Sequence, residues 1–497
     1  MKKRAIVVGA GLGGLAAAIR LQQSGIDVTV LERLPQPGGR CHNIYLEGFH
    51  FDTGPTMLMM IEELERLFED CGRNLADYIR LKKLNPHSRF HFPDGETITM
   101  GSDLLPLAAE FDRIEPGAGR KLTQWLEESK ALYDVGMSQF IDRSKPNFLS
   151  ALDPQNLSML LKGQVTDPLY ECLDRTFSSK RIQDILAFSS LYLGINPFSA
   201  PSIYSLLAYA EIDKGLFFPE GGMTKIAQAL SRLAREIGVK IDCGKEVLGL
   251  EVASTGFPKT VRAIKLKDET ISDTEVVVVN ADLPDAYERL LGTEHPRAGG
   301  FTYTCGALLI FLGLKSTHPD LIHHQVFFPD NYRDSMNTLF EEMKIPDDPV
   351  FYLCSPTTTD PTLAPPGCQA ISILIPVPSE GKEIDWSLRG PRLKAVVLER
   401  LKRNGINIKE EDIQVEHMLS PEEMGDRFRL KKNAAFGLSH RLLQMGPLRP
   451  SNKHHLYENL YFTGASTHPG GGIPMVLKSG RLTAERIITD RGYGRQK

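Results

Sequence analysis

The sequence lacks the features that define several classes of protein. Its seven cysteines are odd in number and include no C-x-x-C pair, so we expect neither a disulfide framework nor a metal site, but reduced, mostly buried thiols of a cytoplasmic protein. No segment reaches about 18 consecutive apolar residues, and a membrane-spanning helix is therefore not predicted. The 58 basic and 62 acidic residues leave a net charge of −4 without a dense basic run. Nucleic acid is therefore not an expected partner.

Internal repeats and low-complexity linkers are also missing from the 497 residues. A chain of this length corresponds to about two or three domains. Hydrophobic residues make up 41% of it, which is enough to bury a sizeable core. What the sequence does contain is a set of glycine-rich turns near its start, in its middle and at its end.

The first of these turns follows a short apolar strand pattern over residues 5–8. In the sequence Gly9-Ala10-Gly11-Leu12-Gly13-Gly14, Gly9 permits a tight turn, Gly11 lets the backbone approach a pyrophosphate, and Gly14 lets a helix pack closely against the strand. The pattern predicts that phosphates bind at the N-terminus of the following helix.

The residues after this turn complete a βαβ pattern. They predict a helix over 16–23 and a second strand over 27–31, which places the carboxylate of Glu32 where a ribose hydroxyl would lie. The alternative is a glycine-rich turn without a ligand. Because strand, glycines, helix and acid all agree, the sequence favours an adenine dinucleotide site.

A second glycine cluster follows Glu32-Arg33. It consists of Pro37-Gly38-Gly39-Arg40 and, farther on, Gly48 to Thr56. Glycines let the chain pass close to a cofactor, and an adjacent arginine can neutralise a pyrophosphate while donating two hydrogen bonds. A surface turn with a solvated arginine is the alternative. A nicotinamide enzyme has no general need for this second cluster, which resembles that of the flavin amine oxidase and carotenoid desaturase superfamily.

The features of a dinucleotide site return twice more along the chain. One of them begins at Phe218-Pro219-Glu220-Gly221-Gly222-Met223 and leads into a predicted helix over 224–237 and several strands. The last of these strands, within residues 275–282, is an apolar run suited to burial on both faces. The other is the end of the sequence, which shows a strand, a glycine turn and a helix to residue 488. Two further regions lie between these sites. Residues 96–217 are mostly helical in pattern. The region after residue 290 contains apolar strand-like runs over 302–314 and 370–376.

These patterns predict an α/β fold with a discontinuous, Rossmann-like nucleotide-binding domain and an inserted α+β substrate domain. The resemblance to the superfamily implies that the first domain binds FAD and that a helical segment faces a membrane. The expected division of the chain is residues 1–95, 218–290 and 456–497 for the FAD-binding domain, 96–217 for the helical substrate and membrane-facing region, and 291–455 for the sheet and helices of the substrate domain.

Further motifs narrow the resemblance. The stretch from Gly464 to Pro474 resembles the carotenoid desaturase signature, and Phe51 to Thr56, Glu220 to Met223 and Asn280 to Asp282 are also similar to that family. The likeness runs nearly from end to end. Residues 187–195 and 434–438 look most like bacterial dehydrosqualene (diapophytoene) and phytoene desaturases.

This resemblance implies FAD as the cofactor and assigns roles to individual positions. Many flavoenzymes have an acid after the glycine that corresponds to Gly464, whereas this chain has Ala465 and Ser466. A side-chain contact from this position to the ribityl chain or phosphate of the cofactor is therefore not expected. The implied cofactor-binding residues are Gly9, Gly11 and Gly14 at the pyrophosphate, Glu32 at the adenosine ribose with Arg33 beside it, Gly39 and Arg40 at the phosphates, Gly54 and Thr56 near the flavin, Val247 with its backbone at the adenine, and Gly464, Gly472, Ile473, Pro474 and Met475 near the pyrimidine edge of the flavin.

The reaction implied by the resemblance is desaturation of a linear 30- or 40-carbon polyprene, dehydrosqualene or phytoene. The flavin accepts a hydride and the neighbouring carbon loses a proton, while the protein aligns the substrate in a dry tunnel. No catalytic acid or base is identifiable; His468 and Asp213 are the polar residues near relevant segments. The alternatives are oxidation of the terminal methyl of an apocarotenoid to an aldehyde, an amine oxidase, and a non-enzymatic flavin or isoprenoid carrier.

A hydrocarbon substrate resides in lipid, so we expect the enzyme to be cytoplasmic and peripheral on the inner face of the cell membrane. Two stretches could contact lipid. The first, residues 148–161, resembles a short amphipathic surface segment, and the second, residues 185–210, carries no charge and is more typical of a tunnel or core lining. Quinone or oxygen is the expected electron acceptor.

Overall fold

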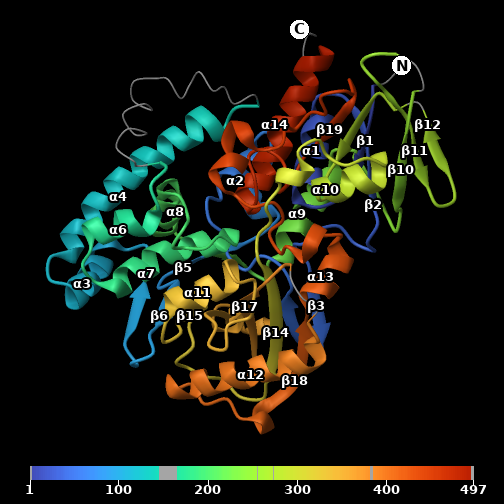
Figure 1. Ribbon diagram of the computed structural model, residues 1–497. Helices are drawn as coiled ribbons and strands as arrows, with labels where there is room; N and C mark the ends of the chain where they lie inside the picture. The colour runs from blue at the N-terminus through green and yellow to red at the C-terminus, as the bar shows by residue number, and fades with distance from the viewer. Residues whose placement is uncertain (1–2, 145–164, 254–255, 273, 381–383, 494–497) are drawn as a thin grey trace.

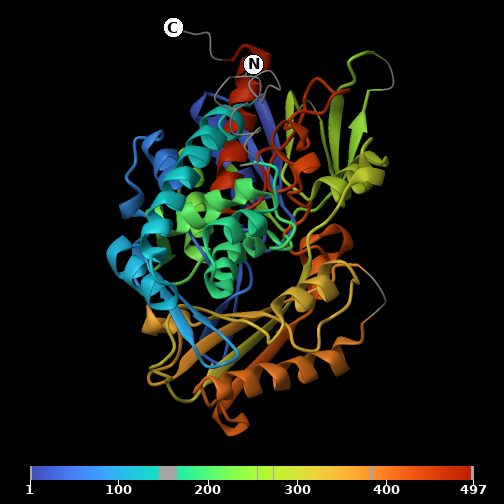
Figure 2. The ribbon, with the colours of Figure 1, turned by 60° about the vertical axis from the view of Figure 1, so that its left-hand side comes forward.

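The computed structural model describes residues 3–144, 165–253, 256–272, 274–380 and 384–493. Its framework consists of a parallel sheet, to which both ends of the chain contribute, and a larger mixed sheet built mostly from the second half of the chain. A group of helices from residues 104–214 lies beside both sheets, as Figure 1 and the rotated view in Figure 2 show.

The parallel sheet has the strand order β19-β13-β1-β2-β9. Its central strand, β1, lies between β13 and β2, and every residue of β13 is buried, which confirms the prediction of a strand covered on both faces. The strands are β1 (Arg4–Val8), β2 (Asp27–Glu32), β9 (Lys240–Cys243), β13 (Val276–Val279) and β19 (Leu460–Phe462).

The alternation of side chains along β1 explains its uninterrupted apolar sequence. Ala5 and Val7 pack against helices on one face, and Ile6 and Val8 pack against a small antiparallel sheet on the other. The first face is covered by α1 (Leu12–Gln23), α9 (Thr224–Glu236) and α14 (Ile473–Arg491), and the second by β10 (Val247–Val252), β11 (Val261–Leu266) and β12 (Thr270–Ser272). Helix α1 begins at Leu12, four residues earlier than the expected start at residue 16, because the glycines of the turn adopt helical geometry in its first turn.

The mixed sheet has the order β18-β14-β17-β16-β15-β6-β7. The predicted apolar runs form β14 (Gly306–Leu314) and β17 (Gln369–Val377), which pair antiparallel. Helix α12 (Trp386–Arg403) covers one face of this sheet. The other strands are β6 (Ser88–His91), β7 (Thr97–Met100), β15 (His324–Phe327), β16 (Phe351–Cys354) and β18 (Ile413–Leu419).

The expected domain boundary at residue 95 falls inside the hairpin of β6 and β7, and both strands belong to the mixed sheet. Just before this hairpin, β5 (Leu81–Leu84) pairs with β8 (Leu216–Pro219). The chain therefore enters the second sheet before residue 95, while the division into three domains stays a prediction.

The region 96–217 is mostly helical, as its pattern predicts. The charge-free run 185–210 forms two helical pieces joined by a largely buried segment, and it packs inside the molecule. Among the described residues, no helix combines the length and the apolar character needed to cross a bilayer. The expected lipid-contacting stretch 148–161 lies outside the described residues. The helices are α3 (Leu104–Ile114), α4 (Ala118–Val135), η2 (Gly136–Ile141), α6 (Leu169–Thr176), α7 (Lys180–Phe188), η4 (Ser189–Leu193), η5 (Ser202–Tyr204) and α8 (Ser205–Lys214).

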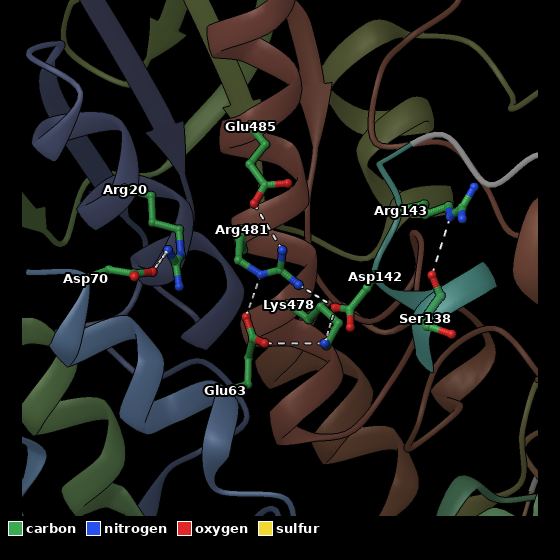
Figure 3. Close-up of polar contacts among 9 residues, drawn as sticks. All are labelled: Arg20, Glu63, Asp70, Ser138, Asp142, Arg143, Lys478, Arg481 and Glu485. Carbon is green, nitrogen blue, oxygen red and sulfur yellow. Dashed lines mark hydrogen bonds and ion pairs between the residues drawn. The ribbon is translucent and has the colours of Figure 1, made fainter. Parts of the chain in front are cut away.

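A buried cluster of charges ties α14 to the helical region (Figure 3). Arg481 Nε lies 2.8 Å from Glu63 Oε1 on α2 (Glu62–Glu69), and Lys478 Nζ lies 3.3 Å from Glu63 Oε2. Both cations also contact Asp142, which follows η2. Two cations thus face two carboxylates, which offsets much of the cost of burying them.

This cluster generates a prediction about stability. Arg481→Met should lower the free energy of unfolding by about 3 kcal/mol, because it leaves the buried Glu63 with a single cation. Urea denaturation measures the change. Arg403→Met is the control, since Arg403 is 68% exposed and pairs on the surface with Glu399, and it should change the free energy by less than about 0.5 kcal/mol. Equal losses in the two variants would contradict the prediction.

Candidate functional site

The first glycine turn ends β1 and opens α1. Gly9 has a φ of +97° and donates its N–H to Leu31 O at 2.8 Å, which turns the chain sharply after Val8. Gly11 caps α1, with no side-chain cap and no acidic residue in the first turn. Because the first N–H groups of a helix have no partner within it, this helix end is suited to an anion.

Asn280 fills the space between the glycine turns from the two ends of the chain. A Cβ on Gly11 would lie 2.7 Å from Asn280 Nδ2, and one on Gly464 would lie 2.7 Å from Asn280 Oδ1. Asn280 Nδ2 also donates to Gly9 O at 3.5 Å. Asn280 belongs to one of the motifs that resemble the carotenoid desaturases, although the sequence predicts no site role for it. Its position directly after the buried strand β13 was the available signal.

Gly14 has a different role from Gly9 and Gly11. A Cβ on Gly14 would lie only 2.2 Å from Gly9 O, so this glycine packs the helix against the strand, as the fingerprint requires. It is not among the residues that line the cavity described below, so the structure does not show it facing a pyrophosphate.

Glu32 ends β2 with a buried carboxylate. Its Oε2 accepts the N–H of Ala10 at 2.6 Å and its Oε1 accepts that of Leu34 at 2.8 Å. Each oxygen can accept a further hydrogen bond, so the carboxylate remains able to bind a hydroxyl. Val247 begins β10 nearby, where its carbonyl accepts Arg289 Nη1 at 2.6 Å.

The second glycine cluster lies against the first. Gly38 donates to Ala10 O at 2.9 Å, and a Cβ on Gly39 would lie 3.2 Å from Gly11 Cα. Arg40 donates from Nη1 to Ala435 O at 3.0 Å. Burial lowers the pKa of its guanidinium, while the charge of Asp282 raises it. A cation is thus held beside the open end of α1. Arg33 is the flanking cation and donates to the carbonyl of Arg427.

The last glycine turn opens α14. Gly472 caps the helix with a φ of +97°, and Ile473, Pro474 and Met475 form a first turn without an acid. Ser466 lies at the position where many flavoenzymes have an acid. Its hydroxyl donates to Asp282 Oδ1, and burial raises the pKa of the Asp282 carboxyl. A carboxylate therefore reaches this turn from the strand end after β13.

Gly54 and Thr56 lie at the boundary with the mixed sheet. A Cβ on Gly54 would lie 1.9 Å from Arg40 O, so only glycine fits there. Thr56 Oγ1 accepts the hydroxyl of Tyr352, on β16, at 2.9 Å.

A cavity of about 740 Å³ joins these segments. Every cofactor-binding residue expected from the sequence lines it, with the exception of Gly14. Its other part is lined mostly by apolar side chains from α4, η2, α7, η4, η5, α8 and the mixed sheet. These include Val135, Met137, Phe140, Ile141, Phe188, Leu191, Leu193, Ile203, Leu206, Leu207, Leu309 and Leu374.

The residues present fit a dinucleotide flavin. Two helix ends without acidic first turns, the half-buried Arg40 and a surface of glycines can hold an anionic pyrophosphate, and Glu32 can bind a ribose. The second helix end can stabilise the negative charge that a flavin gains on reduction.

The two polar residues considered from the sequence have different positions. His468 lines the cavity, and burial lowers the pKa of its imidazole to about 4, so the ring is neutral at pH 7. Asp213 lies outside the cavity wall and pairs on the surface with Lys214.

Sequence reasoning missed two residues that hold the last glycine turn. His440 Nε2 accepts the N–H of Gly471 at 3.0 Å, and the buried Arg449 donates to Ser439 O at 2.7 Å and to Ala465 O. Both lie in a segment without regular periodicity, so their sequence gave no signal of this role.

Comparisons with known proteins decide the family. The family model described as flavin containing amine oxidoreductase matches residues 12–488. The chain belongs to this family. The predicted FAD-type α/β fold and the resemblance to carotenoid desaturases are confirmed, and the protein is an oxidoreductase with FAD as its cofactor.

Individual relatives extend over the whole chain. The zeta-carotene-forming phytoene desaturase of Myxococcus xanthus is 38% identical over 491 residues, which are 98% of this chain and 94% of the relative. The 4,4'-diapophytoene desaturase (4,4'-diaponeurosporene-forming) of Staphylococcus haemolyticus is 33% identical and covers 98% and 99%. Among solved structures, an oxidoreductase from Methanosarcina mazei shares the fold, with a TM-score of 0.65, 16% identity and coverage of 97% and 100%.

The glycine contacts generate a prediction about the cofactor. Gly11→Val should abolish FAD binding, because its Cβ would displace the Asn280 side chain and its methyl groups would enter the cavity. The ratio of flavin to protein absorbance measures the loss. Gly299→Val, at a position where a Cβ meets nothing within 4 Å, should retain the yellow colour. A Gly11→Val protein that is folded and fully yellow would contradict the assignment.

Proposed function

We propose that this protein is an FAD-dependent desaturase that introduces conjugated double bonds into a linear 30- or 40-carbon polyprene, dehydrosqualene (4,4'-diapophytoene) or phytoene, in carotenoid biosynthesis. The observation that carries the proposal is the continuity of one cavity from the glycine turns to an apolar pocket between the helices and the mixed sheet. The relatives named above include desaturases of both substrate lengths, which supports the class of reaction and leaves both lengths in the proposal.

A polyprene has no heteroatom for an enzyme to polarise, so the contribution of this chain is mainly binding and orientation. When bound, the flavin accepts a hydride from an allylic carbon. Side chains such as Phe188, Leu206 and Leu309 exclude water and hold the hydrocarbon in register. The N-terminus of α14 favours the charge that develops on the cofactor.

We also propose that the protein is cytoplasmic and binds the inner face of the cell membrane without crossing it, and that quinone or oxygen takes up the electrons. The low solubility of a polyprene in water supports this location, because the substrate has to enter the apolar part of the cavity from lipid.

Product analysis tests the proposed reaction. Expression in cells that supply phytoene or dehydrosqualene should give a coloured extract, whose absorption lies at longer wavelength as conjugated double bonds are added. Mass spectrometry should show loss of hydrogen and no new oxygen. An aldehyde product would instead indicate oxidation of a terminal methyl, and bleaching of the flavin by amines would indicate an amine oxidase. The absence of a coloured polyene from either substrate would contradict the proposal.

Vesicle flotation tests the proposed location. The purified protein should rise with phospholipid vesicles and be released at alkaline pH, because the proposed binding is to the lipid surface and its described part has no spanning helix. The control is the same gradient without vesicles. A protein that stays at the bottom with vesicles present would contradict membrane binding.

A further inference from the structure

In the part of the chain that the structure describes, no carboxylate lies in the wall of the apolar part of the cavity. The carboxylates that line the cavity there are Glu32, Glu246, Asp282 and Asp285. All four belong to the FAD-binding part, because Glu32 ends β2, Glu246 precedes β10, and the two aspartates follow β13. Desaturation releases a proton from the substrate, so the base has to be reached in another way.

Tyr192 connects the cavity to a buried carboxyl group. It belongs to η4 and lines the apolar part of the cavity. Its hydroxyl donates to Glu211 Oε2 on α8 at 3.1 Å. Glu211 itself is only 4% exposed and does not line the cavity, so Tyr192 is the residue that links its carboxyl group to the cavity wall.

The environment of Glu211 leaves it able to take up a proton. Its Oε1 has no hydrogen-bond partner, and His87 Nδ1 lies 3.5 Å away. Burial raises the pKa of the Glu211 carboxyl to about 7, although its hydrogen bonds with Tyr192 and Ser88 lower it. Burial and the charge of Lys83 lower the pKa of His87 to about 4, so the imidazole is neutral at pH 7 and does not fix the carboxylate as an ion pair.

A carboxyl group that is buried with one oxygen lacking a hydrogen bond destabilises the fold. The same helical region contains a pair with a similar bond that serves as a comparison. Tyr170 donates to Asp184 at 2.9 Å, and burial raises the pKa of Asp184 to about 7, but neither residue lines the cavity. What distinguishes Tyr192 and Glu211 is therefore their place at the substrate pocket.

We propose that Tyr192 and Glu211 form the route by which the proton leaves the substrate during desaturation, with Tyr192 as the catalytic residue that touches the hydrocarbon and Glu211 as the base that acts through it. This inference rests on the proposed function, and it supplies the base that the sequence did not reveal.

The step balances in atoms and charge. One allylic carbon gives up a hydride to the flavin, and the C–H bond of the adjacent carbon breaks while its electron pair forms the new double bond. The released proton binds Tyr192 Oη as the original hydroxyl proton passes to Glu211 Oε2. Burial raises the pKa of Tyr192 well above its usual value, so the phenol is protonated at neutral pH and can pass its proton on.

The test uses the full-length holoenzyme with phytoene or 4,4'-diapophytoene in phosphatidylcholine vesicles. Glu211→Gln and Tyr192→Phe keep the shape of each side chain but remove the proton transfer. Each should lower the rate of desaturation by about 10²–10⁴-fold, with unchanged flavin content and thermal unfolding. Asp184→Asn and Tyr170→Phe are the matched controls, and they should retain the wild-type rate.

The pH dependence separates proton transfer from a structural role. The carboxylate has to be unprotonated, so the wild-type rate should rise with pH through about 7 and then level off. The titratable groups around the pair that would modify this midpoint are His87 and, beside Tyr192, Tyr352. Glu211→Gln should lose the rise at all accessible pH values, whereas Asp184→Asn should keep it.

Infrared titration gives a readout that needs no turnover. The carboxylic acid band of Glu211 should disappear between about pH 6 and 8, and should be missing in Glu211→Gln but present in Asp184→Asn. A Glu211→Gln enzyme with the wild-type rate and pH profile would overturn the inference while leaving the proposed function intact. A wild-type enzyme that desaturates neither polyprene would instead contradict the proposed function.

Discussion

The structure depends on the close approach of two turns that lie more than 450 residues apart in the chain. The turn after β1 and the turn before α14 meet at Asn280, where a Cβ on either Gly11 or Gly464 would lie 2.7 Å from an atom of that side chain. Helices α1 and α14 are equally close, since a Cβ on Gly480 would lie 2.7 Å from Ala16 Cβ. Glycine is required where backbone meets backbone or a buried amide in this way.

This contact brings two helix ends to one cavity and determines its electrostatics. Both helices begin without acidic residues, and the half-buried cation Arg40 lies beside the first of them. The buried cations of α14 itself, Lys478 and Arg481, are matched by Glu63 and Asp142 and hold that helix in place. The field at the cofactor end therefore favours an anion, while the substrate end carries almost no charge.

Much of this arrangement could be predicted from the sequence because it depends on local rules. The glycine turns, the strand over 276–279 and the two apolar strands of the mixed sheet follow from backbone sterics and side-chain alternation, and they lie where the sequence places them. The predicted start of α1, at residue 16, is four residues too late. Helix propensity penalises the glycines that tertiary packing requires in the first turn of this helix.

Other features could not be predicted because they join distant segments through irregular structure. Arg449 and His440 support the last glycine turn from a stretch without periodicity, and Glu211 reaches the cavity only through a tyrosine 19 residues earlier in the chain. A buried carboxyl on a helix has no sequence mark, and its surroundings are set by the fold.

The place of α14 in the chain also has a consequence for biosynthesis. Residues 464–475 complete the wall of the cofactor cavity, and the helix that anchors them ends at Arg491. A nascent chain on the ribosome therefore lacks one side of the flavin site until residues 464–491 have been translated. A polypeptide that stops before residue 464 is consequently expected to be colourless, since the last glycine turn of the cofactor site is missing from it.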